Sequence, residues 1–166
     1  MLHDGISLNM KKEKVKICVN VIKAMREHIQ IGRDSVEAGG ILVGKENMSD
    51  ENVVINNIST PQRGDQQEYN RFYRRDIGHI KFFEDLYEKS GRTLRYIGEW
   101  HTHPEAIPHY SRIDLVNWQK ILRGNHSSNW NFHIIVGYEA IRVWYLQEKI
   151  ELISTIFWKD VDFNWI

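Results

Sequence analysis

Apolar side chains recur along the first half of the chain in runs that predict strands separated by a helix. Residues 1–14 form a polar lead, after which Val15 to Val19 is a short apolar run typical of a strand. Val21 to Ile31 then carries apolar residues at helical spacing. Residues 38–46, AGGILVGKE, predict a glycine-rich buried strand, and residues 52–60 predict a second strand that pairs with it through a polar turn.

The second half of the chain predicts a similar mixture of elements. Ile77 to Ser90 has one apolar side, as an amphipathic helix does, and Gly91 is a typical residue for ending it. We expect a strand from Leu94 to His101 and a helix from about Arg112 to Leu122. Three more apolar runs predict the last strands, at residues 132–139, 140–148 and 150–158. Strands interspersed with helices predict an α/β fold in which helices flank a mixed β-sheet.

Composition predicts one compact domain spanning residues 1–166. The 166 residues contain no repeat, no low-complexity tract and only 3 prolines, so nothing marks a linker. Hydrophobic residues make up 42% and charged residues 27%, a globular balance rather than a disordered one. The 22 Lys and Arg residues equal the 22 Asp and Glu residues, so net charge does not favour a nucleic acid or membrane partner.

Cys18 is the sole cysteine, which excludes an internal disulfide and a cysteine-rich zinc finger. It lies in the apolar run VKICV, where burial as a small strand residue is favoured over catalysis. The N-terminal residues contain no apolar segment of signal-peptide length, and no stretch approaches the length of a membrane span. We therefore expect a cytoplasmic protein.

Polar chemistry concentrates in residues 98–114, GEWHTHPEAIPHYSRID. His101 and His103 are two positions apart, so on an extended strand both imidazoles face the same side. Asp114 lies at the start of the next expected helix and can return to that side. Two imidazoles and one carboxylate form the ligand set of a catalytic zinc ion, with the fourth position open to water. The alternative is that Ser111 and Asp114 are only a capping box and that the histidines are surface residues.

The joint spacing, H-x-H, seven residues, S, two residues and D, resembles the JAMM metalloprotease signature of the MPN (Mov34) domain family. That family also carries an upstream glutamate in the pattern E-x-x-G-x-L-x-G, and residues 37–44, EAGGILVG, match this pattern. No signature position is substituted, unlike in the metal-free scaffolding members of the family. The resemblance extends from Glu37 to the strand near Val136 and implies an MPN-type fold.

The resemblance implies a role for each matched residue. His101, His103 and Asp114 correspond to the ligands of one zinc ion per chain. Glu37 corresponds to the general base, and Ser111 to the residue that hydrogen-bonds the developing oxyanion. The residue types suit these roles, since a carboxylate in an apolar strand has a raised pKa and a hydroxyl can donate to an oxyanion.

Three further polar residues lie near the matched positions. Glu99 alternates with His101 along the expected strand. It either accepts a hydrogen bond from a ligand imidazole and fixes its tautomer, or it is a solvated or core-paired glutamate. Glu105 and His109 are expected at the rim rather than among the ligands. The remaining histidines have no partner spacing and are expected to be ordinary surface or core residues: His3, His28, His79, His126 and His133. The tryptophans expected in the core or at interfaces are Trp100, Trp118, Trp130, Trp144 and Trp158.

The family resemblance implies hydrolysis of a peptide or isopeptide bond that follows the C-terminal tail of ubiquitin or a ubiquitin-like protein. The phrases EAGGILVGK, TPQRGD and GEWHTHPE look most like a bacterial branch whose single-domain peptidases accompany E1/E2-like ubiquitin-transfer enzymes in antiviral (CBASS) defence operons. There they resemble deconjugating peptidases that release a nucleotidyltransferase, the CD-NTase, from its targets. Two alternatives stay open: a peptidase for a bacterial ubiquitin-like protein, and a non-catalytic MPN module that binds a partner or nucleic acid.

Residues 61–75, PQRGDQQEYNRFYRR, form a polar segment in the place of the family's variable insertion, which helps to clamp the substrate tail. Its basic and aromatic side chains are expected to bind substrate: Arg63, Arg71, Phe72, Tyr73 and Arg74, with Tyr69 and Arg75 beside them. The alternative is a solvated loop whose aromatic side chains tuck into the core.

Overall fold

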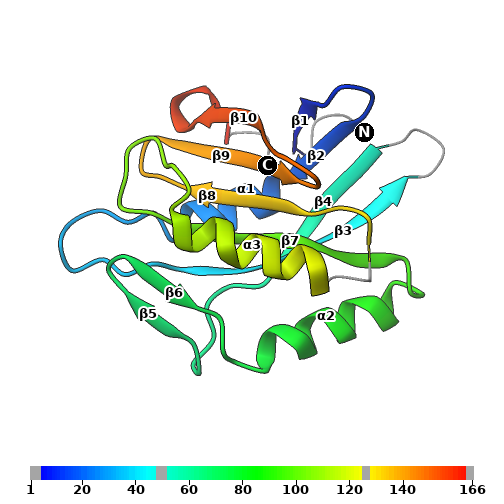
Figure 1. Ribbon diagram of the computed structural model, residues 1–166, viewed down its shortest axis with the longest axis horizontal. Helices are drawn as coiled ribbons and strands as arrows, with labels where there is room; N and C mark the ends of the chain where they lie inside the picture. The colour runs from blue at the N-terminus through cyan, green and yellow to red at the C-terminus, as the bar shows by residue number, and fades with distance from the viewer. Residues whose placement is uncertain (1–4, 48–51, 125–127, 164–166) are drawn as a thin grey trace.

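The computed structural model describes residues 5–47, 52–124 and 128–163, and it consists of one large curved sheet with helices on both faces (Figure 1). The strands lie in the order β1 (Gly5–Asn9), β2 (Lys14–Cys18), β4 (Asn52–Ile58), β3 (Gly39–Asn47), β7 (Leu94–Thr102), β8 (Phe132–Val136), β9 (Ala140–Leu146) and β10 (Ile150–Phe157). The β2–β4 and β7–β8 pairs are parallel and the other pairs are antiparallel. The predicted α/β fold with a mixed sheet is confirmed.

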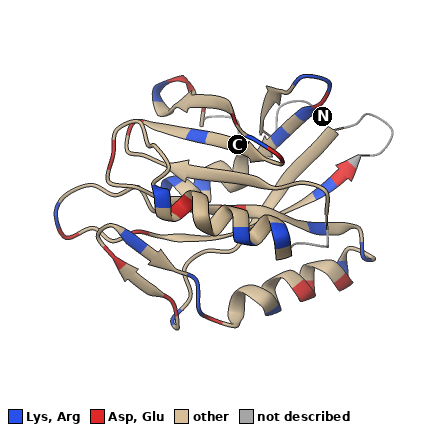
Figure 2. Cartoon of the chain, viewed as in Figure 1, with Lys and Arg blue, Asp and Glu red and all other residues tan. Residues whose placement is uncertain are grey.

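The helices are α1 (Val19–Arg26), α2 (Gly78–Lys89) and α3 (Arg112–Gly124), followed by a 3-10 turn, η1 (Trp158–Asp160). A separate hairpin of β5 (Gln66–Glu68) and β6 (Arg71–Tyr73) stands beside the large sheet. No helix in the described ranges is long and apolar enough to cross a membrane. Figure 2 shows acidic and basic residues interspersed over the elements, as the balanced composition leads one to expect.

The sequence pattern missed two features of this fold. β1 lies inside the polar lead, and the β5–β6 hairpin lies inside residues 61–75, which we expected to be a polar loop. Each of these strands buries at most one side chain, so no run of alternating apolar residues marks it. The helix expected to reach Ile31 is also wrong in length, because α1 ends at Arg26 and the chain turns at Gly32, whose φ is 88°.

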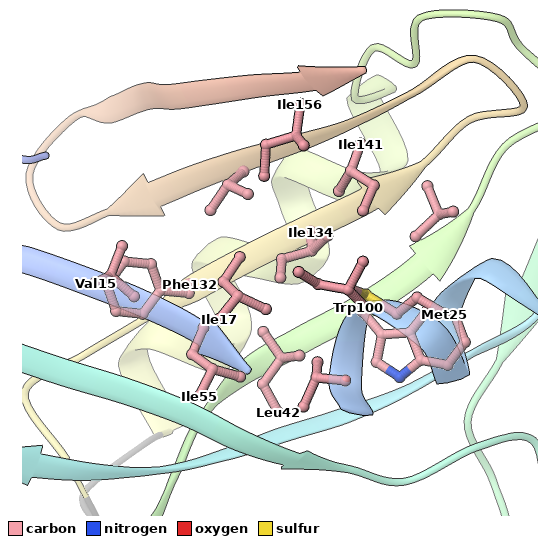
Figure 3. Close-up of a cluster of buried hydrophobic side chains, with 14 of the residues drawn as sticks. Val15, Ile17, Met25, Leu42, Ile55, Trp100, Phe132, Ile134, Ile141 and Ile156 are labelled. Atoms are coloured by element: carbon pink, nitrogen blue, oxygen red, sulfur yellow. The ribbon is translucent and has the colours of Figure 1, made fainter. Parts of the chain in front are cut away.

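Apolar side chains pack on both faces of the sheet. On one face, which we call the α1 face, residues from α1 and most strands form the main core (Figure 3). The sheet curls around this core far enough for β1 and β10 to contact each other. On the opposite face, the α2/α3 face, Trp118 of α3 packs on Ile135, Trp144 and Leu146. There too, α2 covers a third cluster on β3 and β7.

Most of the expected core residues are where the pattern placed them. Trp100, Trp118, Trp144 and Trp158 are buried, and Trp130 packs partly buried against the main core. His79 and His133 are fully buried, and His28 is half-buried with its ring 5.6 Å from that of Trp100. His3 and His126 lie outside the described residues. Cys18 is half-buried rather than buried, because β2 ends there and α1 begins at the next residue.

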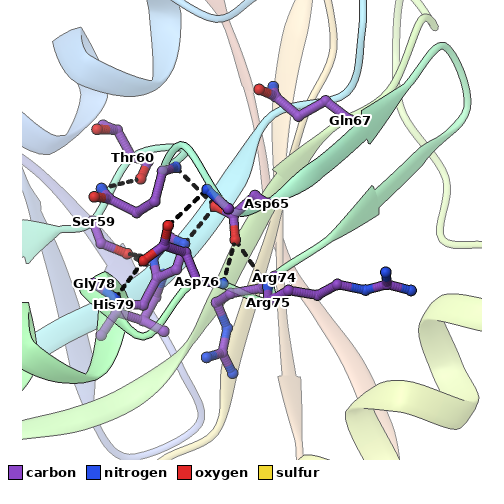
Figure 4. A network of polar contacts seen from close by, with 12 residues as sticks. Ser59, Thr60, Asp65, Gln67, Arg74, Arg75, Asp76, Gly78 and His79 are labelled. Carbon is purple, nitrogen blue, oxygen red and sulfur yellow. Dashed lines mark hydrogen bonds and ion pairs between the residues drawn. The ribbon is translucent and has the colours of Figure 1, made fainter.

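A buried polar network ties the β5–β6 hairpin to α2 and β4 (Figure 4). Asp65, just before β5, accepts backbone hydrogen bonds from Gln62, Arg75 and Asp76. The last two residues follow β6, so Asp65 joins the segments that enter and leave the hairpin. Its carboxylate also lies 2.6 Å from Nε2 of His79, whose Nδ1 lies 2.6 Å from the Ser59 hydroxyl. Burial alone would raise the pKa of Asp65, but these hydrogen bonds lower it below its usual value.

Ser59, His79 and Asp65 have the connectivity of a hydrolase triad, yet their surroundings point to a structural role. Ser59 is only 2% exposed and His79 is fully buried, so no substrate reaches the hydroxyl. The Ser59 hydroxyl already accepts the N–H of Ile41 in β3. The network therefore fixes the insertion against the sheet rather than supplying a nucleophile.

Candidate metal centre

Three donor side chains converge at the end of β7: His101, His103 and Asp114. The two Nε2 atoms are 3.0 Å apart, and the Asp114 carboxylate oxygens lie 3.2 Å from His101 and 3.4 Å from His103. In a tetrahedral zinc site with bonds of about 2.0–2.2 Å, neighbouring ligand atoms are separated by about 3.3–3.6 Å. The distance between His103 and Asp114 lies in this range, and the other two distances are shorter by about 0.3 Å or less, so a small outward movement of His101 would let the three donors hold a single zinc ion and leave a fourth position for water.

A β-bulge in β7 decides which face of the sheet the histidines occupy. Opposite β3, Leu42 pairs with Gly98 and Val43 with Tyr96, so Ile97 is the extra residue. Alternation is shifted by one position there, and His101 points to the α2/α3 face instead of into the main core. Gly98 permits this course, because its φ is 149° and a Cβ would lie 1.7 Å from the carbonyl oxygen of Phe132.

The third donor is positioned by a helix cap. The backbone N–H of Ser111 donates to the Asp114 carboxylate at 2.6 Å, and the Asp114 N–H donates to the Ser111 hydroxyl at 3.1 Å. This is the reciprocal arrangement of a capping box, with Asp in the usual Glu position. Capping and convergence on the histidines therefore occur together, so the two interpretations of Ser111 and Asp114 do not exclude each other. Ser111 itself is exposed at the start of α3.

Glu37 approaches the three donors from the segment that precedes β3. Its carboxylate lies 3.9 Å from Nε2 of His103, and the residue is 5% exposed. Burial raises the pKa of Glu37 to about 8, although the nearby His103 opposes that rise. The structure thus brings together four of the five residues expected at the site, and the fifth, Ser111, adjoins them through the cap.

Glu105 has a closer relation to the site than the sequence indicated. Its carboxylate lies 3.0 Å from Nδ1 of His103 and also accepts the backbone N–H of His109 at 3.1 Å. An Nδ1–H donated to Glu105 leaves Nε2 of His103 free to bind a metal. No periodic pattern marks Glu105, because it lies in the turn after Pro104; only its place two residues after the second histidine would have suggested it.

Glu99 and His109 have other partners. Glu99 forms an ion pair with Arg74 at 2.6 Å and accepts a hydrogen bond from the Tyr96 hydroxyl at 3.1 Å. Of the two alternatives open for Glu99, these contacts favour the paired glutamate over a partner of an imidazole. His109 is exposed and contacts Arg142, as a rim residue would.

The electrostatics of the donor cluster favour a cation. Burial opposes a charge on His103, but hydrogen bonds to Asp114 and Glu105 outweigh it and raise the His103 pKa to about 9. Burial likewise opposes the charge on Asp114, yet hydrogen bonds from His101 and His103 hold its pKa well below the usual range. A proton is therefore bound firmly between these groups, and a divalent cation would compete with it for the same electron pairs.

A cavity of about 770 Å³ opens beside the donors, between the hairpin and α3. The predicted substrate-binding residues Arg71, Phe72, Tyr73 and Arg74 line it, whereas Arg63 is exposed and is not among its lining residues. From the opposite side α3 contributes Ile113, Asn117 and Lys120. Phe72 and Tyr73 of the hairpin are half-buried and Tyr69 is exposed, and none of the three belongs to the main core.

Comparisons with known proteins bear on the family and the fold. A model of the family of prokaryotic homologues of the JAB domain matches residues 19–147. A relative from Escherichia coli named CD-NTase/cGAS isopeptidase is 36% identical over 104 residues, which are 63% of this chain and 65% of the relative. A Vibrio cholerae relative of the same name is 31% identical over 145 residues, 87% of this chain and 88% of the relative.

Solved structures add evidence on the fold alone. The solution structure of a protein from Desulfitobacterium hafniense superimposes with a TM-score of 0.57 and 16% sequence identity. The superposition covers 83% of this chain and 88% of the other.

Proposed function

This chain belongs to the family of prokaryotic homologues of the JAB domain, and on that premise we propose that it is a zinc-dependent isopeptidase. The observation that carries the proposal is the convergence of His101, His103 and Asp114 beside the buried carboxylate of Glu37. The relatives named CD-NTase/cGAS isopeptidase support a substrate in which a CD-NTase is joined to its target. We propose that the chain cleaves that bond and releases the CD-NTase, as part of CBASS defence in the cytoplasm.

The proposed reaction is hydrolysis of an isopeptide bond. A zinc ion held by the three donors would polarise the scissile carbonyl and lower the pKa of a nearby water molecule. Glu37 removes a proton from the attacking water and delivers it to the departing lysine amine, as the C–N bond breaks. A group that both takes and gives a proton works best with a pKa near the working pH, and burial moves Glu37 in that direction. The exposed Ser111 hydroxyl donates to the oxyanion.

The cavity accounts for how an extended tail would reach the donors. In the described part of the chain β6 pairs only with β5, so its other edge is open to an added strand. We propose that a conjugated C-terminal tail lies between β6 and α3. Arg71 and Tyr73 stand on this path, with the Arg71 guanidinium 5.2 Å from the Tyr73 ring centroid. Arg74 is held by Glu99 and would shape the groove rather than move with the tail.

Two lysine conjugates test the substrate class: one carries the C-terminal tail of a CD-NTase, and the other carries a bacterial ubiquitin-like protein. The zinc-loaded chain is expected to cleave the CD-NTase conjugate with the higher kcat/KM. Preference for the ubiquitin-like conjugate would replace the proposed substrate by the related one. Cleavage of neither conjugate by folded, zinc-loaded protein would leave a binding module and contradict the isopeptidase.

Zinc affinity is expected to rise with pH across the neutral range. Zinc must displace the proton that His103 holds up to a pH of about 9, so each pH unit below that value weakens apparent binding by about tenfold. Competition with a chelator of known affinity, at about pH 6.5, 7.5 and 8.5, measures this slope. An affinity that stays constant, after correction for the chelator's own protonation, would contradict the assignment of His103 as a ligand.

A further inference from the structure

The β5–β6 hairpin contacts the proposed general base as well as lining the cavity. Glu37 lies two residues before β3 begins, so no ladder of the large sheet holds its backbone. The Glu37 N–H donates instead to the carbonyl oxygen of Glu68 at 2.7 Å. The Glu37 carbonyl oxygen accepts from the side-chain amide of Gln67 at 2.9 Å. Both partners, Glu68 and Gln67, lie in β5, so the hairpin fixes the peptide groups before and after the Glu37 Cα.

A buried chain of hydrogen bonds joins the hairpin to the next residue, Ala38. The Ala38 N–H donates to the Thr102 hydroxyl at 2.9 Å, and this hydroxyl donates to the side-chain oxygen of Gln30 at 2.9 Å. The Gln30 amide in turn donates to the carbonyl oxygen of Tyr69, in the hairpin turn, at 2.9 Å. Gln30 and Thr102 are 2% and 0% exposed, so the first two hydrogen bonds are shielded from water, and the third, to Tyr69, is partly buried.

Side-chain packing adds a third connection. The ring of Phe72 in β6 lies directly over Gly39, where a Cβ would be 2.6 Å from the ring. Only glycine allows this approach, so the hairpin contacts Glu37 and Gly39 directly and is linked to Ala38 through Gln30 and Thr102. At its other end the hairpin is anchored to α2 through Asp65 and His79. It therefore forms a fixed bridge from α2 to the backbone of Glu37.

We propose that Gln67 is a positioning residue and that the hairpin aligns Glu37 for proton transfer. The inference rests on the proposed function, since it requires Glu37 to act as a base. The Gln67 amide sets the peptide plane after Glu37 and thereby the direction in which its carboxylate projects. Proton transfer needs heavy atoms about 2.6–3.2 Å apart, so a small rotation there slows the chemical step. Gln67 is not among the cavity-lining residues, so tail binding does not depend on it.

The test compares Gln67→Met with Gln66→Met in the full-length, zinc-loaded protein. Both changes replace a glutamine side chain of β5 by an apolar one of similar shape, but among the described residues the Gln66 amide donates to the side chain of Glu68 and not to the segment of Glu37. Gln67→Met is expected to lower kcat about tenfold with KM changed by less than about twofold and zinc content unchanged. Gln66→Met is expected to match wild type, and Arg71→Met, on the tail path, to raise KM instead.

Amide hydrogen exchange in the metal-free protein provides a readout that does not need activity. Exchange at Glu37 and Ala38 is expected to be faster in Gln67→Met than in Gln66→Met. Unchanged kcat, a change in KM alone, or unchanged exchange in Gln67→Met would each overturn the positioning role. If wild type cleaves neither conjugate, the proposed function fails, and the exchange comparison still decides whether Gln67 holds this segment.

Discussion

Replacing Glu37 by glutamine is expected to lower kcat by about 10²- to 10⁴-fold while the protein still binds one zinc ion per chain. The amide keeps the shape of the side chain but cannot take a proton from water. Glu37 is not one of the three converging donors, so the metal site remains complete. Single-turnover cleavage of the conjugate and zinc content by elemental analysis measure the two outcomes separately.

Glu84→Gln is the matched control for this change. Glu84 is exposed on α2, so the control replaces a glutamate by glutamine away from the site. It is expected to leave both kcat and zinc content unchanged. Wild-type turnover by Glu37→Gln would remove Glu37 from the mechanism. Loss of zinc in Glu37→Gln would instead make Glu37 a ligand.

The same substitution has a pH-dependent effect on the metal-free protein. The Glu37 pKa is about 8 in the folded chain, against 4.5 as its unperturbed value, so folding retains a proton that the unfolded chain releases between these pH values. Wild-type stability therefore falls, through this group, as pH rises from about 4.5 to about 8. Metal-free Glu37→Gln is expected to melt at a higher temperature than wild type, with a difference that grows over that pH range.

Replacing Asp114 by asparagine is expected to weaken zinc binding by at least about 100-fold and to abolish turnover with it. Asparagine removes the negative charge between the two histidines but keeps an oxygen that can accept the Ser111 N–H. The helix cap therefore survives, but the metal-free protein is expected to melt below wild type, because the charged hydrogen bonds of Asp114 with His101 and His103, which hold the Asp114 pKa low, are weakened. Zinc affinity by chelator competition and melting temperature by calorimetry measure the two properties independently.

Two comparison variants separate ligation from capping. Ser111→Ala loses the cap hydroxyl, so it is expected to lose about 1 kcal/mol of stability and part of kcat while keeping zinc. Asp85→Asn, on the exposed side of α2, is expected to change none of these properties. Wild-type zinc affinity in Asp114→Asn would mean that another carboxylate is the third ligand, and Glu37, 3.9 Å from Nε2 of His103, would be the first to examine.

Two local sequence patterns predicted three residues of the candidate site. His101 and His103 share a face in any extended strand, and Asp114 begins a helix that the apolar pattern also predicted. The glutamate that completes the cluster came only from the resemblance to the E-x-x-G-x-L-x-G pattern. No local rule would join Glu37 to His103, since their approach depends on the pairing of β3 with β7.

The features that escaped prediction depend on contacts distant in sequence. The bulge at Ile97 becomes visible only when β7 is paired with β3, yet it decides which face His101 occupies. The β5–β6 hairpin buries little of its own surface and is held by hydrogen bonds that Asp65 accepts and that Gln30 and Gln67 donate. Strands that are held by hydrogen bonds of this kind need no alternating apolar residues. The sequence of residues 61–75 therefore predicted a polar loop and not two strands.

The central claim, zinc-dependent isopeptide hydrolysis, is tested most directly by intact mass spectrometry of one conjugate. A CD-NTase joined through its C-terminal carboxylate to a lysine side chain is incubated with the protein before zinc removal, after it, and after zinc is restored. Zinc-loaded protein is expected to return the free CD-NTase and the free lysine component, with masses that sum to the conjugate plus one water. Cleavage is expected to stop without zinc and to resume with it. A conjugate that stays intact with folded, zinc-loaded protein, or is cut equally after zinc removal, would contradict that claim.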